Sequence, residues 1–345
     1  MHKIEGGIHI RAVILAAGRG KRLAPLTDAL PKPLIQCAGN TLLGRIISDL
    51  QKAGITEISI GIGWKGDSIR EYVETHFPNS KISIIDVPYY EIGPLKTLVT
   101  SMGTGSGPIL ICPGDFVGET GFLQEMIEHY QSVPERQIML AMDTTKNDGT
   151  RFFIDKSGIL LDSDKSPSKS LITGRSAMIL IAESTFLDLC RKGLEQGKTR
   201  ILDVLVEFMM RGDSIHTWVV NRVWFDVDSI SEILHANRNL LTKETPATIG
   251  VYIPEGDTFE TGNRLFLDSG IQIDSGVTIH GPTFIARDTS IDSKSEIGPY
   301  VSVGEGTKIN RGCFISDAVL FGRTELSSNT QLSRVVVYNN FVFME

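Results

Sequence analysis

Residues 12–34 read AVILAAGRGKRLAPLTDALPKPL, and the prediction of the fold starts from this stretch. Ala12–Ala16 is a continuous apolar run, as in a parallel strand that is buried on both faces. Gly18 and Gly20 follow directly, and glycine lets the backbone turn tightly and approach a ligand closely. The stretch therefore predicts a buried strand with a glycine loop at its carboxyl end.

Strand-like and helix-like segments alternate from residue 11 to residue 242. Apolar runs predict strands, and apolar residues spaced along one face predict helices. Further strands are expected at Ile58–Ile62, Ile82–Val87, Ile109–Cys112 and Ile138–Met142, and helices at Thr41–Ala53, Asp67–His76 and Phe122–Tyr130. This alternation predicts an α/β domain with a Rossmann-like, mainly parallel sheet.

A second pattern begins near residue 265, where an aliphatic or aromatic residue recurs at every sixth position. The series consists of Leu267, Ile273, Ile279, Ile285, Ile291, Ile297, Val303, Ile309, Ile315 and Phe321. Period six is typical of a hexapeptide-repeat β-helix, whereas a β-sandwich would alternate with period two. One coil cannot bury its own apolar row, so the coils must stack.

The two patterns give the expected domain boundaries. The α/β domain is expected over residues 11–242 and the β-helix over residues 265–345. Residues 243–264 between them contain Pro246 and Pro254 with several Gly, Glu and Thr residues, a composition typical of a linker.

Composition excludes several classes of protein. The 345-residue chain has a formal net charge of −7, which argues against nucleic-acid binding because that needs a basic surface. Its four cysteines form no CxxC pair, so we expect free thiols in a reducing compartment. Neither a signal peptide nor an apolar run of 18 residues is found, so we expect a cytoplasmic protein without a membrane partner.

The glycine loop has the composition of a phosphate-binding loop. Backbone N–H groups at residues 18–20 can surround phosphates, and basic residues at 19, 21 and 22 add positive charge. The dinucleotide fingerprint does not fit, because it needs glycine at Leu23. A Walker A loop does not fit either, because it needs glycine at Leu15 and Ser or Thr at Arg22. A solvated basic turn is the alternative interpretation.

The segment 12–34 resembles the opening of the sugar-1-phosphate nucleotidylyltransferase family, whose pattern is LAAGxGTRLxPLTxxxPKPL. Nearly every fixed position matches, and the clear departure is Lys21, where the family usually has Thr or Ser. The resemblance implies an enzyme that joins a nucleoside triphosphate to a sugar 1-phosphate, with residues 11–242 as its catalytic domain. It also implies that residues 265–345 form the left-handed β-helix found in many of these enzymes.

The resemblance assigns roles to the residues of the motif. Arg22 and Lys32 are implied to be the catalytic residues that contact the phosphates. The nucleotide is implied to contact Leu15, Ala16, Ala17, Gly18, Arg19, Gly20 and Lys21. Nucleotidyl transfer needs mainly positioning and charge stabilisation, which a glycine loop with cationic side chains can supply.

Two aspartates are implied to be the metal ligands. Asp115 follows the strand expected at Ile109–Cys112, and a carboxylate at the carboxyl end of a buried strand faces the ligand cleft of α/β proteins. Residues 224–237 resemble the family motif WxDVGTPxDLLxAN, whose first aspartate corresponds to Asp226. Asp228 replaces the usual glycine, which alters the loop or adds a third carboxylate. Carboxylate oxygens suit Mg²⁺, the expected cofactor.

Two further family motifs match less well. Gly93 corresponds to the glycine of a GTA-type turn that contacts base and sugar, but Pro94 and Leu95 depart from that pattern. Lys165, in Asp164-Lys165-Ser166-Pro167, corresponds to the lysine of an EKP motif that binds the sugar's phosphate. The sequence therefore leaves the nucleobase open, and glucose, mannose and N-acetylglucosamine 1-phosphate all stay candidates.

Three alternatives concern the protein as a whole. Hexapeptide acyltransferases use a histidine on a coil as general base, and His280 is the single histidine of the repeat region. A regulatory subunit would bind nucleotide sugar without turnover. The β-helix can also serve as an assembly surface, so we expect a homo-oligomer.

Overall fold

The computed structural model describes residues 9–134, 137–146, 151–154, 159–163, 172–243, 258–259 and 264–344. The chain packs into two compact units that do not follow its linear order. The first comprises Met1–Arg19, Pro31–Pro33 and Ile46–Trp224, and the second comprises Gly20–Leu30, Leu34–Arg45 and Phe225–Glu345. The predicted boundaries at residues 242 and 265 stay predictions, and most of the expected linker lies outside the described residues.

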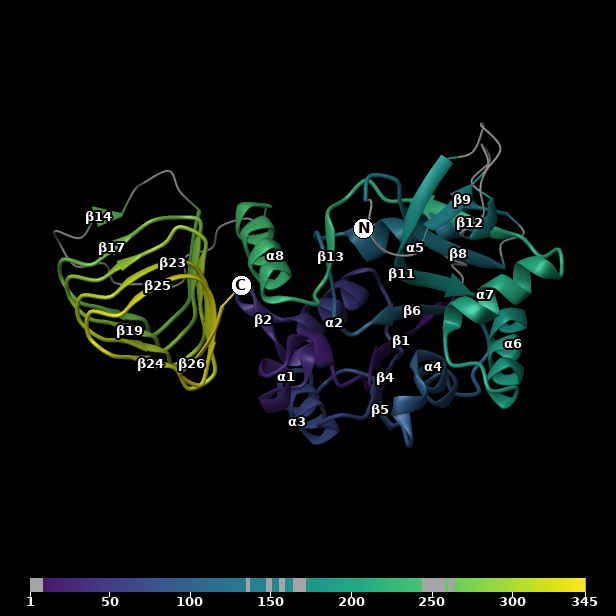
Figure 1. Cartoon of the computed structure of the whole chain (residues 1–345), viewed down its shortest axis with the longest axis horizontal. Helices are drawn as coiled ribbons and strands as arrows, with labels where there is room; N and C mark the ends of the chain where they lie inside the picture. The colour runs from purple at the N-terminus through teal and green to yellow at the C-terminus, as the bar shows by residue number, and fades with distance from the viewer. Residues whose placement is uncertain are drawn as a thin grey trace. The chain divides into compact units, whose positions relative to one another are not determined.

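A parallel four-stranded arrangement forms the centre of the first unit (Figure 1). Its order is β5 (Ile82–Asp86), β4 (Ile58–Ile62), β1 (Arg11–Ala16) and β6 (Ile109–Pro113). β1 pairs with β4 on one side and with β6 on the other. This central position explains the unbroken apolar run in β1, and the predicted mainly parallel α/β sheet is confirmed.

Antiparallel pairing extends the sheet beyond β6. β11 (Ile172–Ala182) runs antiparallel to β6, and β8 (Ile138–Asp143) runs antiparallel to β11. β12 (Ile215–Val219) then pairs parallel with β8. Two shorter strands, β9 (Arg151–Ile154) and β10 (Leu160–Ser163), complete this end of the sheet.

Helices α4 (Pro94–Ser101), α6 (Ser184–Glu195) and α7 (Ile201–Met210) cover one face of this sheet. Val13 of β1 and Ile111 of β6 join their buried cluster. Because side chains alternate along a strand, the neighbouring Ile14 points to the opposite face. The remaining helices of this part of the chain are α2 (Leu42–Lys52, shared by the two units), α3 (Gly66–His76) and α5 (Phe122–Ser132).

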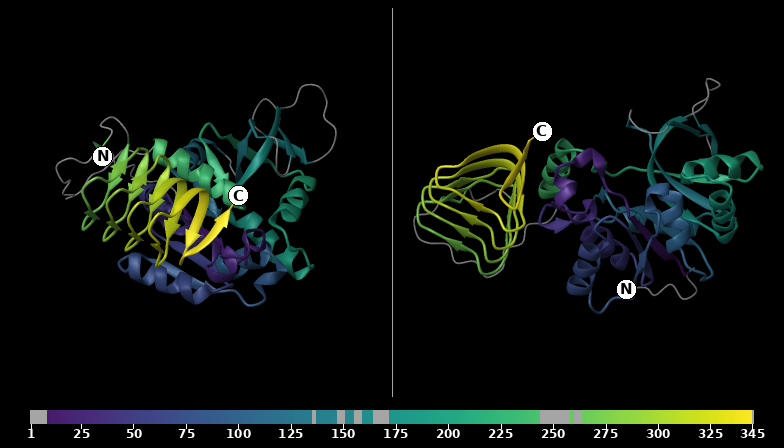
Figure 2. Two further views of the ribbon diagram at one scale, coloured as in Figure 1. Left: turned by 60° about the vertical axis from the view of Figure 1, so that its left-hand side comes forward. Right: turned by 60° about the horizontal axis from the view of Figure 1, so that its bottom comes forward.

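The second unit contains a β-helix whose coils form three columns of parallel strands (Figure 2). The first column consists of β14 (Thr258–Phe259), β17 (Thr278–Ile279), β20 (Glu296–Ile297) and the first halves of β23 (Phe314–Phe321) and β25 (Gln331–Tyr338). The second consists of β15 (Leu265–Leu267), β18 (Thr283–Ile285), β21 (Val301–Val303) and the second halves of β23 and β25. The third consists of β16 (Gln272–Ile273), β19 (Ser290–Ile291), β22 (Lys308–Ile309) and β24 (Glu325–Leu326).

The hexapeptide period holds through most of the β-helix and then shortens by one residue. Ile279 pairs with Ile297, eighteen residues later, as three hexapeptides require. Val303 pairs with Leu320, only seventeen residues later. Leu320 therefore fills the interior position, and the prediction that Phe321 continues the series is wrong. Strand β26 (Phe341–Met344) follows the last coil and pairs antiparallel with β25.

An asparagine on α8 (Ile230–Lys243) fastens the N-terminal hairpin of this unit to the coils. The Asn237 Oδ1 atom accepts hydrogen bonds from the Ala38 N–H at 2.9 Å and from the Ser302 hydroxyl at 2.6 Å. Its Nδ2 group donates to the Tyr300 carbonyl at 3.0 Å. Ala38 joins β2 (Gln36–Cys37) to β3 (Asn40–Thr41), which follow the short helix α1 (Leu26–Ala29).

One prediction about composition can be compared with the structure. The four cysteines Cys37, Cys112, Cys190 and Cys313 are free and buried, as expected. In the described part of the chain, no helix combines the length and the apolar character that crossing a membrane requires.

Candidate active site

The ends of β1 and β6 are held together beside the start of the glycine loop. The Gly114 N–H donates to the Leu15 carbonyl at 2.9 Å, and a Cβ on Gly114 would lie 3.0 Å from that oxygen. Glycine before Asp115 thus allows the two chain segments to approach closely. A Cβ on Gly18 would meet nothing within 4 Å, so the space beside this residue is open to a ligand.

Lys32 and Asp115, predicted separately from two motifs, form an ion pair in the first unit. The Lys32 Nζ atom lies 2.5 Å from the Asp115 Oδ2 atom. The Lys32 side chain is only 7% exposed, whereas that of Asp115 is 26% exposed. A buried ammonium group needs a paired carboxylate, so Asp115 holds Lys32 in place while staying accessible itself.

The neighbouring strand residue Cys112 is inert. Burial raises the pKa of its thiol well above the usual value, and the negative charges of Asp115 and Asp49 raise it further. The thiolate is the reactive form of cysteine, so Cys112 is neither a nucleophile nor a metal ligand at neutral pH.

Two aromatic residues that sequence reasoning missed lie near Arg19. The Arg19 guanidinium lies 4.4 Å from the ring centre of Trp64, which follows β4, in a cation–π contact. Desolvation raises the pKa of Tyr90, the Glu91 carboxylate adds to this, and the charge of Arg19 opposes it. The available signal was position: the carboxyl ends of parallel strands meet at one edge, and Trp64 lies at such an end.

The structure explains why Pro94 departs from the GTA-type motif. Gly93 has φ 138°, and a Cβ there would lie 2.7 Å from the Thr199 carbonyl oxygen, so glycine is required. Pro94 is the first residue of α4, a position at which the missing N–H of proline costs nothing. Leu95 is fully buried in the core beneath the helix. Gly93 thus lies directly before a helix N-terminus.

In the second unit, Arg22 pairs with the aspartate that replaces the family glycine. Gly20 has φ 66°, and Lys21–Leu23 form a turn of 3₁₀ helix. The Arg22 guanidinium contacts the Asp228 carboxylate, with the Arg22 side chain 74% exposed. The Asp228 N–H donates to Glu232 at 2.6 Å, and the Glu232 N–H donates to the Ser229 hydroxyl at 3.2 Å, as in a capping box at the start of α8.

Asp226 is the last residue of β13 (Trp224–Asp226), and the first residue of that strand is anchored in the first unit. The Trp224 indole N–H donates to Asp143 Oδ2 at 2.8 Å. Burial tends to raise the pKa of Asp143, but hydrogen bonds from Thr145, Trp224 and the Lys146 N–H outweigh burial and lower it. A charged Asp143 therefore fixes the start of the strand that carries Asp226.

Two further residues were singled out from the sequence. Lys165 lies outside the described residues. His280 lies in the β-helix, where its Nε2 atom is 2.9 Å from the Glu296 Oε1 atom and its side chain is 23% exposed. This pairing gives the imidazole a carboxylate partner but does not test an acyltransferase role.

Comparison with known families finds two matches along the chain. Residues 12–203 match a family described as a MobA-like NTP transferase domain. Residues 279–342 match a family described as the GMPPB C-terminal domain. The first match begins in β1 and includes the glycine loop, Lys32, Gly93 and Asp115.

Individual relatives are similar at low identity. A mannose-1-phosphate guanyltransferase of Emericella nidulans is 23% identical over 278 residues, which cover 76% of this chain and 73% of the relative. The bifunctional protein GlmU of Methanocaldococcus jannaschii is 26% identical over 67% of this chain and 54% of its own length. An N-acetylmuramate alpha-1-phosphate uridylyltransferase of Neisseria meningitidis serogroup B is 27% identical over 66% of this chain and 96% of its own length.

Proposed function

The chain belongs to the MobA-like NTP transferase domain family, and on this basis we propose that it transfers a nucleotidyl group from a nucleoside triphosphate to a sugar 1-phosphate. The products are a nucleotide sugar and pyrophosphate. Relatives named as guanyltransferases and uridylyltransferases of sugar 1-phosphates support this reaction class.

The contact between Lys32 and Asp115 is the observation that carries the proposal. It joins a nearly buried cation to an accessible carboxylate at the carboxyl ends of β1 and β6. Ligands of open α/β sheets bind at this end of the strands. A lysine and an aspartate side by side can contact a phosphate and a metal ion at the same time.

Asp115 and Asp226, the aspartates of the two family motifs, are the proposed ligands of a divalent cation, with Asp228 as a third candidate. Carboxylates are the ligands that Mg²⁺ prefers, and it commonly takes one or two of them together with phosphate oxygens. Because Lys32 contacts Oδ2 of Asp115, Oδ1 can serve as the metal ligand. When bound, Mg²⁺ would neutralise negative charge on the triphosphate.

The remaining residues position and stabilise the reacting phosphates. An oxygen of the sugar 1-phosphate attacks the α-phosphorus, the bond to the α–β bridging oxygen breaks, and pyrophosphate leaves with the electron pair. Lys32 stabilises the charge that develops on the α-phosphate, and Arg22 holds the pyrophosphate. The nucleophile is already an anion at neutral pH, so no general base is needed.

The glycine loop would surround the triphosphate through its backbone N–H groups. The space beside Gly18 is open, and Arg19 is fixed by its contact with the Trp64 ring. When substrate binds, Arg22 must break its ion pair with Asp228 and contact the phosphates instead. Gly93 would lie beside the base and sugar, and Lys165 would contact the sugar's phosphate.

GTP and mannose 1-phosphate are the substrate pair that we propose first. The mannose-1-phosphate guanyltransferases of Emericella nidulans and Aspergillus fumigatus match over 76% of this chain, whereas the uridylyltransferase of Neisseria meningitidis matches over 66%.

To test the proposal, each of several nucleoside triphosphates is combined with each of several sugar 1-phosphates in the presence of Mg²⁺. The release of pyrophosphate is then measured for every pair. We expect turnover for at least one pair, highest for GTP with mannose 1-phosphate, and loss of turnover in Asp115→Asn. Release in the absence of any sugar phosphate, or full activity of Asp115→Asn, would contradict the proposed reaction. A different preferred pair would revise only the substrates.

Two finer proposals accompany this function. The free, buried cysteines fit a cytoplasmic protein, where nucleoside triphosphates are available. The exposed apolar residues Phe341 and Met344 on the open strand β26 fit a homo-oligomer assembled through the β-helix. Light scattering of the wild type and of Phe341→Ser would test the assembly.

A further inference from the structure

Met178 lies in a bulge of β11, beside the end of β6. Between Ser176 and Leu180, β11 advances four positions while its partner strand β8 advances two. On the other side of β11, the pairing with β6 ends at Leu180. Because β11 and β6 run antiparallel, the bulge lies along the last residues of β6, which lead to Asp115. Bulges re-aim side chains and are frequent next to active sites.

The backbone of Met178 is strained, and the core gains little from its side chain. Its φ is 60°, a conformation that costs free energy for a residue with a Cβ and that glycine adopts freely. The Met178 side chain is 49% exposed. The Met178 N–H donates to the Ser176 hydroxyl at 2.9 Å, and glycine at this position would keep that hydrogen bond. The fold alone therefore does not explain why methionine occupies this position.

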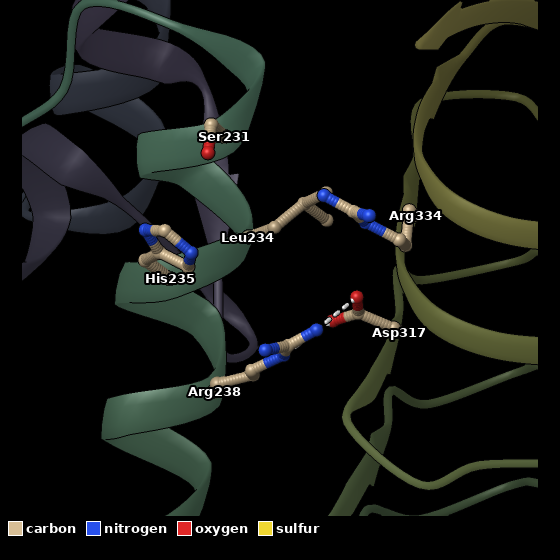
Figure 3. Close-up of a pocket in the computed structure, with 6 residues that line it drawn as sticks. All are labelled: Ser231, Leu234, His235, Arg238, Asp317 and Arg334. Atoms are coloured by element: carbon tan, nitrogen blue, oxygen red, sulfur yellow. Dashed lines mark hydrogen bonds and ion pairs between the residues drawn. The ribbon is translucent and has the colours of Figure 1, made fainter. Parts of the chain in front are cut away.

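Asp317 of the β-helix is strained in the same way, but its side chain has a structural purpose. Its φ is 46°, and its carboxylate accepts hydrogen bonds from the Arg238 guanidinium of α8 (Figure 3). This ion pair contributes to the packing of the second unit. Met178 carries no charge and is half exposed, so its strain is of the kind found at ligand sites.

The strained residues of the first unit gather at one edge of the sheet. Among its described non-glycine residues, positive φ occurs at Lys65, Tyr89 and Met178. Lys65 comes three residues after β4 and Tyr89 three residues after β5. The parallel strands β5, β4, β1 and β6 end at this edge, and the bulge of β11 lies beside it. Ligands of open α/β sheets bind at this edge.

The order of the strands places Met178 on the acceptor side of the proposed reaction. The glycine loop follows β1, and its Arg19 contacts Trp64 after β4, so the proposed nucleotide site is on the side of β1 and β4. Asp115, the proposed metal ligand, follows β6, which lies between β1 and β11. In an in-line transfer, the acceptor approaches the α-phosphorus from the side opposite to the leaving pyrophosphate. The acceptor sugar is therefore expected on the side of β11.

We propose that Met178 is a specificity-determining residue, whose side chain forms an apolar wall that limits the size of the acceptor sugar. This inference rests on the proposed nucleotidyl transfer. A hexose ring presents C–H groups on its faces, and an unbranched thioether can pack against them. An acetamido substituent is larger and polar, so beside this wall it would lose hydrogen bonds to water. Hexose 1-phosphates should therefore be preferred over their 2-acetamido analogues.

The test compares the kcat/KM for a hexose 1-phosphate with that for its 2-acetamido analogue, with mannose and glucose as parent sugars. In Met178→Gly the ratio of the two values should fall roughly tenfold, because the wall is removed. The KM for the triphosphate should stay unchanged. Lys65→Gly is the matched control, since it relieves the same strain at the end of β4 and should leave the ratio unchanged. Circular dichroism checks that both variants fold.

Calorimetric binding of the same sugar phosphates, with Mg²⁺ and without triphosphate, separates this inference from the reaction itself. A wild-type preference for the hexose that Met178→Gly reduces would support the wall even without pyrophosphate release, and only the proposed function would then fail. The inference would be overturned by an unchanged ratio for Met178→Gly in both assays, or by an equal change in Lys65→Gly. It would also be overturned if none of these sugar phosphates were bound or turned over.

Discussion

Lys32 Nζ contacts Asp115 Oδ2 at 2.5 Å, although 83 positions separate the two residues in the chain. The contact ties the Pro-Lys-Pro segment to the end of β6. The Asp115 carboxylate can therefore serve two purposes. Its Oδ2 atom contacts the Lys32 ammonium group, and its Oδ1 atom can bind a further ligand. Asp115 compensates the charge of the nearly buried Lys32, whose ammonium group is thereby positioned to meet a phosphate.

Replacing Lys32 by alanine should reduce turnover by roughly 10²–10³-fold, because an aligned charge-assisted donor is lost from the reacting phosphates. The fold should survive, since Asp115 is partly exposed and can be hydrated. Steady-state pyrophosphate release and circular dichroism give the two readouts. Lys52→Ala is the matched control, because Lys52 also pairs with an aspartate, Asp49, but is 67% exposed. Equal losses in the two variants would contradict the role of Lys32.

Replacing Asp228 by glycine, the residue usual in the family, should lower KM for the nucleoside triphosphate. Arg22 is held by Asp228 and must leave it to reach the phosphates. An exposed ion pair contributes up to about 1 kcal/mol, so we expect a decrease of up to about fivefold. Initial rates at varied triphosphate and Mg²⁺ concentrations check this. A higher Mg²⁺ requirement with unchanged KM would instead identify Asp228 as a metal ligand.

Asn237→Ala should destabilise the second unit by roughly 2–4 kcal/mol. The change removes three hydrogen bonds and leaves the Ala38 N–H and the Tyr300 carbonyl without this partner. Urea unfolding followed by circular dichroism measures the loss. Asn239→Ala on the same helix is the control, because the Asn239 Oδ1 atom is buried without a hydrogen bond and its removal should cost little. Similar losses in the two variants would show that Asn237 does not fasten the hairpin.

Asp143 should make the stability depend on pH in the acidic range. Its folded-state pKa is lowered, so its stabilising effect is complete above the unfolded value of about 3.9 and disappears as the pH falls through the folded value. Asp143→Asn should therefore lose less unfolding free energy than the wild type between pH 7 and about pH 3. Asp86→Asn, at the exposed end of β5, should behave like the wild type. Identical pH profiles for Asp143→Asn and the wild type would contradict this.

Much of the architecture was predictable because its signals are local. The apolar run of β1 and the spacing of apolar residues in α2 depend only on neighbouring residues, and the corresponding elements form where expected. The hexapeptide period predicted the stacked coils for the same reason. It did not predict the shortened coil before Leu320, because one missing residue at a corner leaves a period that still appears regular from Ile273 to Ile315.

The candidate site was predictable only in part. Motifs suggested Lys32 and Asp115 one at a time, but no motif suggested that they touch. Trp64 and Tyr90 were missed because nothing in their immediate neighbours distinguishes them from ordinary aromatic residues. Pro94 departs from the GTA-type motif, and the reason is seen only in the structure, where Pro94 is the first residue of helix α4.

The sequence by itself determined the order of strands and helices, the glycine loop and the repeat of the β-helix. Each of these follows from the backbone preferences and apolar spacing of adjacent residues. The tertiary structure alone decided which distant residues meet: Lys32 with Asp115, Arg22 with Asp228, and Asn237 with one coil of the β-helix. Such contacts depend on how separate elements pack, and the free energy of packing is set by surfaces that come together only when the chain has folded.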